Sequence, residues 1–283
     1  MTICISVKVH DCLVFAADSA TSISTVDNNG NQVILKVFNH GNKVFNLYKG
    51  LPVAAMTCGM GNIGEASIAT LAKDFRLLVR DTGGKYYIDE KNYTIEDFAK
   101  QAYEFFFNDK YAALAVKPRG DHSFEFWIGG YSTGASASEV WKIHIENGAC
   151  AGPTKVRDGN DLGIDAAGQP EAFNRIVVGY GSQIGTALQA IGVAAADIPK
   201  AVDEIKKRTQ ANLAYASMPV QDAIRLADFL VETTKGYVSF VPGADTVGGE
   251  TDIAAVTRHE GFKWVRRKHY FGLDLNPRET DRA

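Results

Sequence analysis

The sequence predicts an α+β fold in which strands and helices form separate layers of one sandwich. Two observations indicate this class: the chain opens with two adjacent apolar strands, and later strands and helices occur in groups. A doubly wound parallel sheet would instead alternate strand and helix one to one. With 283 residues the chain can bury a large core. We expect a single domain over residues 1–283.

The N-terminal hairpin is the clearest local signal. Side chains alternate between two faces over residues 3–9, which is the period of a strand. A short polar turn follows at residues 10–11, and residues 12–17 form a second, apolar strand that ends at Asp18. Depending on the length of the turn, the hairpin places Asp18 beside Thr2 or one residue away from it.

Periodicity and turn residues predict the remaining elements. Thr94 resembles the start of a capping box, and Pro219 favours the first turn of a helix. Further strands are expected at residues 33–38, 43–48, 52–58, 123–131, 138–145, 150–156, 175–179, 251–257 and 262–267. Helices are expected at residues 62–79, from 94 onward, at 182–191, at 198–212 and from 219 onward. We also expect a helical insert around residues 195–217 and a mobile tail after residue 275.

Charge and hydropathy exclude several classes of function. The net charge of −3 lacks the basic footprint of a nucleic-acid or anionic-membrane partner. The one basic cluster, at residues 266–268, is expected to be a solvated face. Asp11 and Asp18 interrupt the only early apolar stretch, and no run reaches the roughly 18 apolar residues of a membrane helix. We therefore expect a soluble, cytoplasmic protein that binds neither nucleic acid nor membrane.

No metal or cofactor site is indicated. The six histidines show neither HxxxH nor HExxH spacing. Residues 59–64 form a literal GxGxxG, but no second strand ends in an acidic residue about 20 positions later, as a dinucleotide fold requires. We favour a turn that presents a backbone amide there. The four cysteines have no CxxC spacing and are expected to be free thiols in a reducing cytosol: Cys4, Cys12, Cys58 and Cys150.

Thr2 is the candidate nucleophile. Initiator methionine is usually trimmed before a small residue, so removal of Met1 leaves Thr2 with a free α-amine. Such an amine has a pKa of roughly 7.7–8.0 and can accept the hydroxyl proton near neutral pH. Nucleophile and base then reside on one residue. Threonine at this position is common in itself, so the interpretation depends on the residues around it.

Asp18, Lys43 and Gly59 are the candidate supporting groups. A carboxylate that ends an apolar strand is costly to bury without a partner, and Lys43 opens a strand that can bring one. A lysine near the hydroxyl favours the alkoxide, and the carboxylate orients the lysine. A structural ion pair is the alternative for these two residues. Gly59 follows a strand, and its lack of a Cβ lets a backbone N–H approach a developing oxyanion.

These segments together carry a resemblance to a known family. They are Thr2 to Asp18 with the spacing Thr-x15-Asp, residues 43–47 and 56–59, and, more loosely, residues 219–223 and 245–249. In this order they resemble proteasome β-subunits and their bacterial relatives HslV and Anbu. The resemblance covers nearly the whole chain, and it is most specific in the N-terminal part.

The resemblance implies an N-terminal-nucleophile hydrolase with a four-layer αββα sandwich. It implies Thr2 as nucleophile and base, Asp18 and Lys43 as the supporting pair, and Gly59 as the oxyanion donor. It also implies a threonine-type endopeptidase that assembles with itself into hexameric or heptameric rings, stacked as a double ring, and cuts unfolded polypeptide without a cofactor. Whether an ATPase unfoldase is a partner stays open.

Departures from the family pattern bear on activity. No arginine follows Asp18, and Tyr180 stands where the family's serine would fall. The closing turn offers Asp245, or Ala244 in the register that matches its glycines, and it lacks a serine. Tyr180 and Asp245 are therefore auxiliary candidates. Two other functions stay open: a ring-forming structural homologue with little or no proteolytic activity, and an amidase of the same fold that acts on small molecules.

Overall fold

The computed structural model describes residues 2–27, 32–118 and 123–268. It shows a mixed α+β fold with antiparallel sheets, which confirms the α+β class expected from the sequence. Two five-stranded sheets dominate it. The first sheet has the order β12 (Gly163–Gly168), β1 (Ile3–Lys8), β2 (Cys12–Ala17), β13 (Asp252–Thr257) and β14 (Gly261–Arg266). The second has the order β11 (Thr154–Arg157), β10 (Glu139–Glu146), β9 (Ser123–Gly130), β6 (Val53–Gly59) and β5 (Val44–Asn46).

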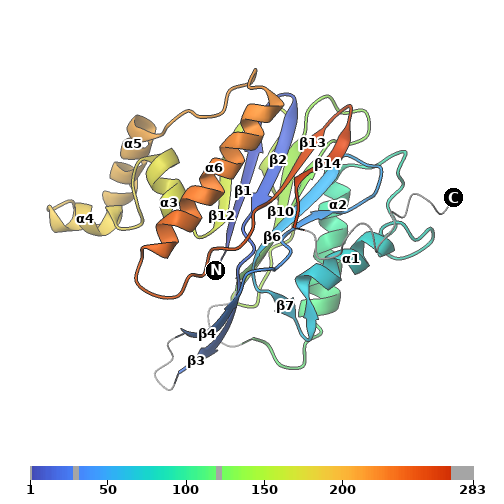
Figure 1. Cartoon of the computed structure of the whole chain (residues 1–283), viewed down its shortest axis with the longest axis horizontal. Coiled ribbons are helices and arrows are strands. Elements are labelled where there is room, and N and C mark those ends of the chain that lie inside the picture. The colour runs from blue at the N-terminus through green and yellow to red at the C-terminus, as the bar shows by residue number, and fades with distance from the viewer. Residues whose placement is uncertain (1, 28–31, 119–122, 269–283) are drawn as a thin grey trace.

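Two small hairpins and a set of helices complete the described chain. The hairpins are β3 (Thr21–Val26) with β4 (Gln32–Phe38), and β7 (Asn62–Ile63) with β8 (Ala66–Ser67). The β3–β4 hairpin projects from one end of the molecule (Figure 1). The helices are α1 (Ile68–Leu78), α2 (Ile95–Ala102) with its π-helical continuation η1 (Tyr103–Tyr111), α3 (Glu171–Phe173) with η2 (Asn174–Val178), α4 (Ile184–Ala190), α5 (Ile198–Thr209) and α6 (Val220–Ser239).

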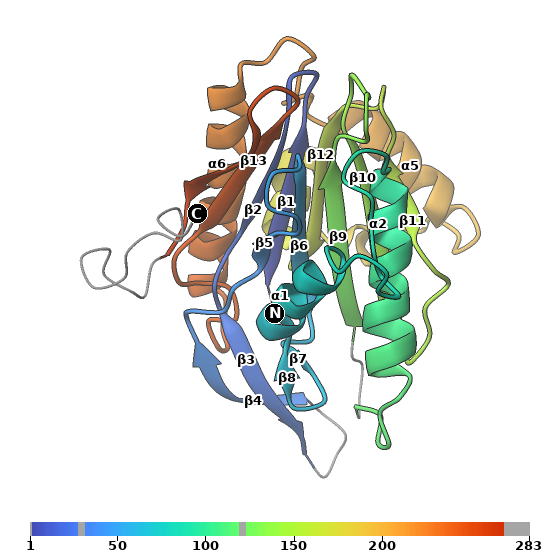
Figure 2. The same ribbon diagram turned by 90° about the vertical axis from the view of Figure 1, so that its right-hand side faces the viewer.

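Three apolar clusters hold the sheets and helices together. One lies between the two large sheets and contains Phe15 from the first and Trp127 from the second. A second packs the outer face of the first sheet against α6, through residues such as Ile5 and Ala227. The third packs the second sheet against α1, α2 and η1, with Phe106 in contact with its aromatic neighbours. Figure 2 shows α6 on one side of the strands and α2 on the other.

The alternation expected in the N-terminal hairpin explains how β1 serves two clusters. Ile3, Ile5 and Val7 point into the cluster under α6, whereas Cys4 points between the sheets. Successive side chains of a strand point to opposite faces, so both faces of β1 are buried. The first strand of the chain, which follows Thr2, is therefore held rigidly in the centre of the molecule.

One expected element was wrong in its start and another in its type. The helix expected over residues 62–79 begins only at Ile68, because the preceding residues form the β7–β8 hairpin. Gly64 turns there with φ +62°, and Ser67 then caps α1 by accepting the Thr70 N–H at 3.1 Å. The strand expected at residues 175–179 is instead helical, since η2 continues α3. Its β-branched residues favour a strand locally, but packing against the α6 cluster decides the outcome.

Other differences concern what the sequence pattern did not reveal. Strands β3 and β12 were not expected, and β12 pairs with β1 along its whole length. Lys268, expected on a solvated face, is only 4% exposed. Helices α4 and α5 have no buried residues within the described chain. Among the described residues, no helix has the length and apolar character needed to cross a bilayer.

Candidate active site

Thr2 lies immediately before β1 and is only 4% exposed. Its carbonyl oxygen accepts the Gln169 N–H at 2.7 Å. Gly168, which ends β12, makes this approach possible: its φ is +94°, and a Cβ there would lie 2.0 Å from the Thr2 carbonyl oxygen. The backbone of Thr2 is thus fixed by a neighbouring strand that tolerates only glycine at the contact.

Asp18 follows β2 and is fully buried. Its Oδ1 accepts the Ile3 N–H at 3.0 Å and the Lys43 ammonium at 2.7 Å. Its Oδ2 accepts the backbone N–H groups of Ala20 and Gly248, both at 3.0 Å. Only an ionised carboxylate accepts at both oxygens and donates nowhere, so four donors require the charged form.

The hairpin register decides between the two expected positions of Asp18. Cys4 pairs with Ala17, so Asp18 lies opposite Ile3, one residue from Thr2. The Asp18 N–H also donates to the Ile3 carbonyl at 3.2 Å. The carboxylate therefore turns back onto the first residues of β1 and reaches the lysine at the same time.

Lys43 comes directly before β5 and is 6% exposed. Its carbonyl accepts the Thr57 N–H at 2.9 Å, which anchors its backbone to β6. Its Nζ donates to Asp18, as the sequence predicted for this pair. Because the two partners come from different sheets, the ion pair forms only when the sheets are packed together.

Gly59 ends β6 in a conformation that favours glycine, with φ +91°. A Cβ at this position would lie 2.0 Å from the Ser123 carbonyl oxygen. The same carbonyl accepts the next N–H, that of Met60, at 2.9 Å. The backbone of residues 59–60 thus lies close against the start of β9, at the point where the sequence predicted a turn that presents an amide.

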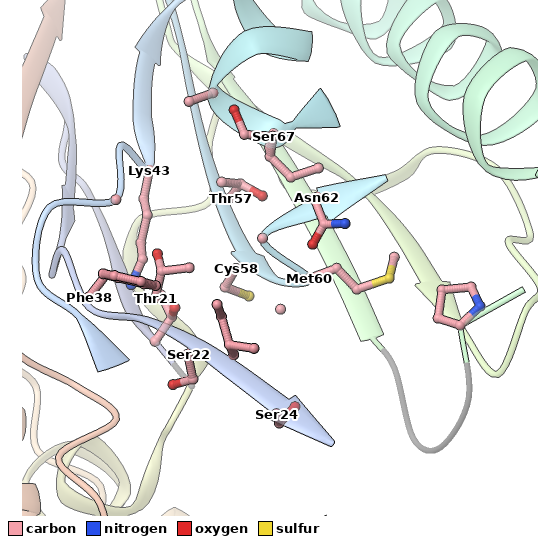
Figure 3. Close-up of a pocket in the computed structure, with 18 of the residues that line it drawn as sticks. Thr21, Ser22, Ser24, Phe38, Lys43, Thr57, Cys58, Met60, Asn62 and Ser67 are labelled. Atoms are coloured by element: carbon pink, nitrogen blue, oxygen red, sulfur yellow. The ribbon is translucent and has the colours of Figure 1, made fainter. Parts of the chain in front are cut away.

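A cavity of about 1020 Å³ brings three of the predicted site residues together: Thr2, Lys43 and Gly59 all line it. Its other walls come from β3, β4, the residues around β7 and β8, and the start of α1. Figure 3 shows Lys43 extending toward Thr21 and Phe38, with Cys58 and Met60 across from them. Asp18 is not among the residues that line the cavity, but its carboxylate is paired with Lys43, which is.

Other nucleophilic side chains in the cavity wall are less suited to react. Burial raises the pKa of the Cys58 thiol far above its usual range, so it stays neutral and unreactive. The Thr57 hydroxyl donates to the Glu125 carbonyl at 3.0 Å, and the Ser67 hydroxyl caps α1. Thr2 is the wall residue for which removal of Met1 supplies a base on the same residue.

The comparisons with known proteins do not name a family. No protein-family model matches the sequence, and no curated protein does. The assignment of function therefore rests on the geometry of the site and on the sequence pattern.

The two auxiliary candidates lie elsewhere. Neither Tyr180 nor Asp245 is among the residues that line the cavity, and Asp245 is exposed. The closing turn reaches the site through its backbone instead: Gly248 donates to Asp18, and its carbonyl accepts the Ser19 N–H at 2.9 Å. Tyr180 follows the helical segment η2, where the sequence predicted a strand, so the element expected before it was wrong.

Gln169 is the residue beside Thr2 that sequence reasoning missed. The signal was the run Gly168-Gln169-Pro170, a turn that follows a short alternating segment. The strand itself was too polar to recognise, because Asp165 interrupts it. In the structure that carboxylate pairs with Arg157 at 2.9 Å.

The GxGxxG segment also belongs to this cavity. Gly59, Gly61 and Gly64 all line it. The segment leads into the β7–β8 hairpin and not directly into a helix, so it lacks the helix N-terminus that binds pyrophosphate in dinucleotide folds. Within the described ranges, no three His, Cys, Asp or Glu side chains are grouped so that they could hold a metal ion.

Proposed function

We propose that this chain is a threonine-type endopeptidase subunit of the N-terminal-nucleophile class. The observation that carries the proposal is the position of Thr2, Lys43 and Gly59 in the wall of one cavity, with the buried Asp18 carboxylate holding the lysine. These three wall residues supply a nucleophile, a cation and a backbone turn. They lie at the ends of the separate strands β1, β5 and β6, so their convergence is a property of the whole fold.

The arrangement of the core supports the finer fold assignment. Apolar clusters join α6 to the first sheet, the first sheet to the second, and the second sheet to α1 and α2. This order of helix, sheet, sheet and helix is that of the four-layer αββα sandwich implied by the resemblance. We propose that fold for the chain.

In the proposed mechanism, removal of Met1 exposes the Thr2 α-amine. The Thr2 hydroxyl attacks the scissile carbonyl while the α-amine takes its proton, and the Gly59 N–H stabilises the oxyanion that forms. Collapse breaks the C–N bond, the departing amine takes that proton, and an ester remains on Thr2. Water then attacks the ester and gives a proton to the α-amine; the bond between the acyl carbon and the Thr2 oxygen breaks, that oxygen takes the proton back, and the peptide leaves as its acid. Lys43 favours the alkoxide throughout, and Asp18 fixes its position.

An unfolded polypeptide is the proposed substrate. Two segments of extended or turn conformation, residues 20–24 and residues 57–62, line the cavity together. Its wall mixes hydroxyl side chains with apolar ones such as Ile23, Phe38 and Leu114. Such a surface can hold an extended chain by backbone contacts without selecting one side chain.

We further propose that the chain works as part of a hexameric or heptameric ring, stacked in pairs. Large apolar side chains on α6 and just after it remain exposed in the isolated chain, among them Phe229 and Phe240. Helices α4 and α5 likewise bury none of their residues within the described chain. Light scattering tests this assembly, and a monomeric mass would contradict it.

One observation favours a second function, a ring-forming structural subunit with little proteolysis. Asp245 is exposed, and neither it nor Tyr180 lines the cavity, so neither side chain is among the wall residues that surround Thr2. The positions of Asp18 and Lys43 favour catalysis. We therefore rank the peptidase first.

Hydrolysis of unfolded casein and of fluorogenic peptides tests the proposal. We expect cleavage by the wild type, retention of part of it by Thr2→Ser, and its loss in Thr2→Ala. Thr82→Ala, at an exposed loop position, is the matched control and should cleave as the wild type does. Equal cleavage by Thr2→Ala and wild type would contradict the assignment of the nucleophile. Absence of cleavage in all of them would favour the structural subunit.

A further inference from the structure

A second buried ion pair lies behind the Asp18–Lys43 pair. The Lys268 ammonium contacts Oδ2 of Asp252, and the two side chains are 1% and 3% exposed. The Lys268 N–H also donates to Oδ1 of Asp252 at 3.1 Å. A buried charge requires a partner, and this lysine has one in Asp252.

Ser19 joins this second pair to the candidate active site. It follows Asp18 directly and is fully buried. Its Oγ accepts a hydrogen bond from the Lys268 ammonium at 2.6 Å and donates to the Glu250 carbonyl at 2.5 Å. The Ser19 hydroxyl is therefore fixed by one hydrogen bond that it accepts and one that it donates. Because Ser19 follows Asp18 directly, these bonds also fix the backbone beside Asp18.

The pairing of β13 with β2 places the Lys268–Asp252 ion pair near Asp18. Asp252 lies opposite Ala17 in that register. Gly248, in the turn before β13, donates to Asp18 and accepts from the Ser19 N–H. Lys268 lies just after the end of β14 and contacts both Asp252 and Ser19.

We propose that Lys268 is a positioning residue for the reaction at Thr2: through Ser19 it holds the Asp18 carboxylate, and with it Lys43, in the geometry that the reaction needs. This inference rests on the proposed function. Lys268 does not line the cavity, so it acts on the reacting groups only through other residues.

The charges around Lys268 fit this role. Burial lowers the pKa of Lys268, whereas the neighbouring Asp252 and Asp18 carboxylates raise it and the Lys43 ammonium lowers it further. The two lysines and two aspartates therefore form one buried, charge-balanced group. Loss of the charge on Lys268 therefore changes the electrostatic potential at Asp18 and Lys43.

A positioning role predicts a change in reaction rate without a change in binding. We use a peptide β-lactone, whose ring opens as its carbonyl is transferred to the Thr2 oxygen, and measure the maximal labelling rate and the half-saturating concentration separately. In Lys268→Met the maximal rate should fall on the order of tenfold to a hundredfold, since misplaced catalytic groups lose about this much. The half-saturating concentration should stay within about twofold, because no contact in the cavity wall is lost.

Three further variants and one matched control make the test independent of folding defects. Lys268→Met with Asp252→Asn removes both charges and leaves no unpaired buried ion, so it should fold and still react slowly. Ser19→Ala breaks only the link and should slow labelling to a similar extent, and combining it with Lys268→Met should add little. Lys263→Met, an exposed lysine of β14, is the matched control and should react as the wild type does.

The outcomes separate this inference from the proposed function. A wild type that is not labelled at Thr2 overturns both. A wild type that is labelled, with unchanged maximal rates in Lys268→Met, the double variant and Ser19→Ala, overturns the positioning role alone. A rise in the half-saturating concentration with an unchanged rate would also contradict it, since that result indicates a damaged cavity wall.

Discussion

Lys43 and Asp18 form an ion pair of 2.7 Å that joins the two large sheets of the molecule. Lys43 precedes the edge strand β5 of one sheet, and Asp18 follows β2 of the other. The pair is almost completely buried, with side chains 7% and 0% exposed. The candidate active site is therefore a product of the packing of the sheets, and the stability of the fold and the chemistry of the site depend on the same residues.

The first prediction concerns Asp18→Asn. An amide keeps the shape of the side chain, but its NH₂ group faces hydrogen-bond donors, and the Lys43 ammonium loses its counter-charge. Breaking a buried pair in this way costs about 3–5 kcal/mol. We expect the free energy of unfolding, measured by urea denaturation, to fall by roughly that amount, and reaction at Thr2 to be lost.

Asp11→Asn is the matched control for this change. Asp11 lies at the turn of the same hairpin, and its side chain is 66% exposed. Its substitution should alter the free energy of unfolding by no more than about 0.5 kcal/mol. If Asp18→Asn is as stable as this control, the buried pair does not support the fold as described.

The second prediction compares two glycines with the same backbone conformation. Gly59 and Gly50 have φ of +91° and +97°, but a Cβ meets the Ser123 carbonyl at 2.0 Å in the first and nothing within 4 Å in the second. Gly50→Ala should cost roughly 1–2 kcal/mol for the backbone conformation alone. Gly59→Ala should cost about 1–3 kcal/mol more, because the turn must move.

Thermal and urea denaturation of the two alanine variants measure this difference. The displaced turn should also weaken reaction at Thr2 in Gly59→Ala and leave it intact in Gly50→Ala. Equal stability of the two variants would contradict this prediction, because it would mean that a Cβ at Gly59 meets no obstacle at β9.

The third prediction is a loss of stability at alkaline pH. Burial raises the pKa of the Cys12 thiol from 9.0 to about 12. Above about pH 9 the unfolded chain therefore loses this proton while the folded chain keeps it. The stabilisation is complete below the unfolded pKa and declines as the pH rises toward the folded one, by roughly 1.4 kcal/mol per pH unit for one thiol.

Cys12→Val isolates this thiol. Burial also raises the pKa of Cys4 and Cys58, so the wild type should lose stability more steeply than a single thiol would require. In the variant, the slope between about pH 10 and pH 11 should be shallower by roughly 1.4 kcal/mol per pH unit. Parallel slopes for variant and wild type in urea titrations would contradict the burial of a neutral thiol at this position.

The sequence indicated those parts of the site that depend on local patterns. The alternation in residues 3–9 and the apolar run after it defined the hairpin, and its register limited Asp18 to two positions. A strand-opening Lys43 was the natural partner for a buried carboxylate. Gly59 stood out because a glycine directly after a strand marks a turn with a close backbone approach.

The parts that the sequence did not reveal depend on pairing between distant segments. Gln169 reaches Thr2 because β12 pairs with β1, although more than 150 residues separate them. Lys268 was assigned to a solvated face with its two arginine neighbours, since a basic run is usually exposed. Its burial depends on Asp252 and Ser19, and a pairing of this kind has no periodic signature in the chain.

The decisive test of Thr2 as an N-terminal nucleophile is the mass of the protein and of its N-terminal peptide after reaction with a peptide β-lactone. We expect Met1 to be absent and one acyl group to be added per chain, on Thr2. Thr2→Ala should remain unmodified under the same conditions. Retention of Met1, or equal labelling of wild type and Thr2→Ala, would contradict an N-terminal threonine nucleophile.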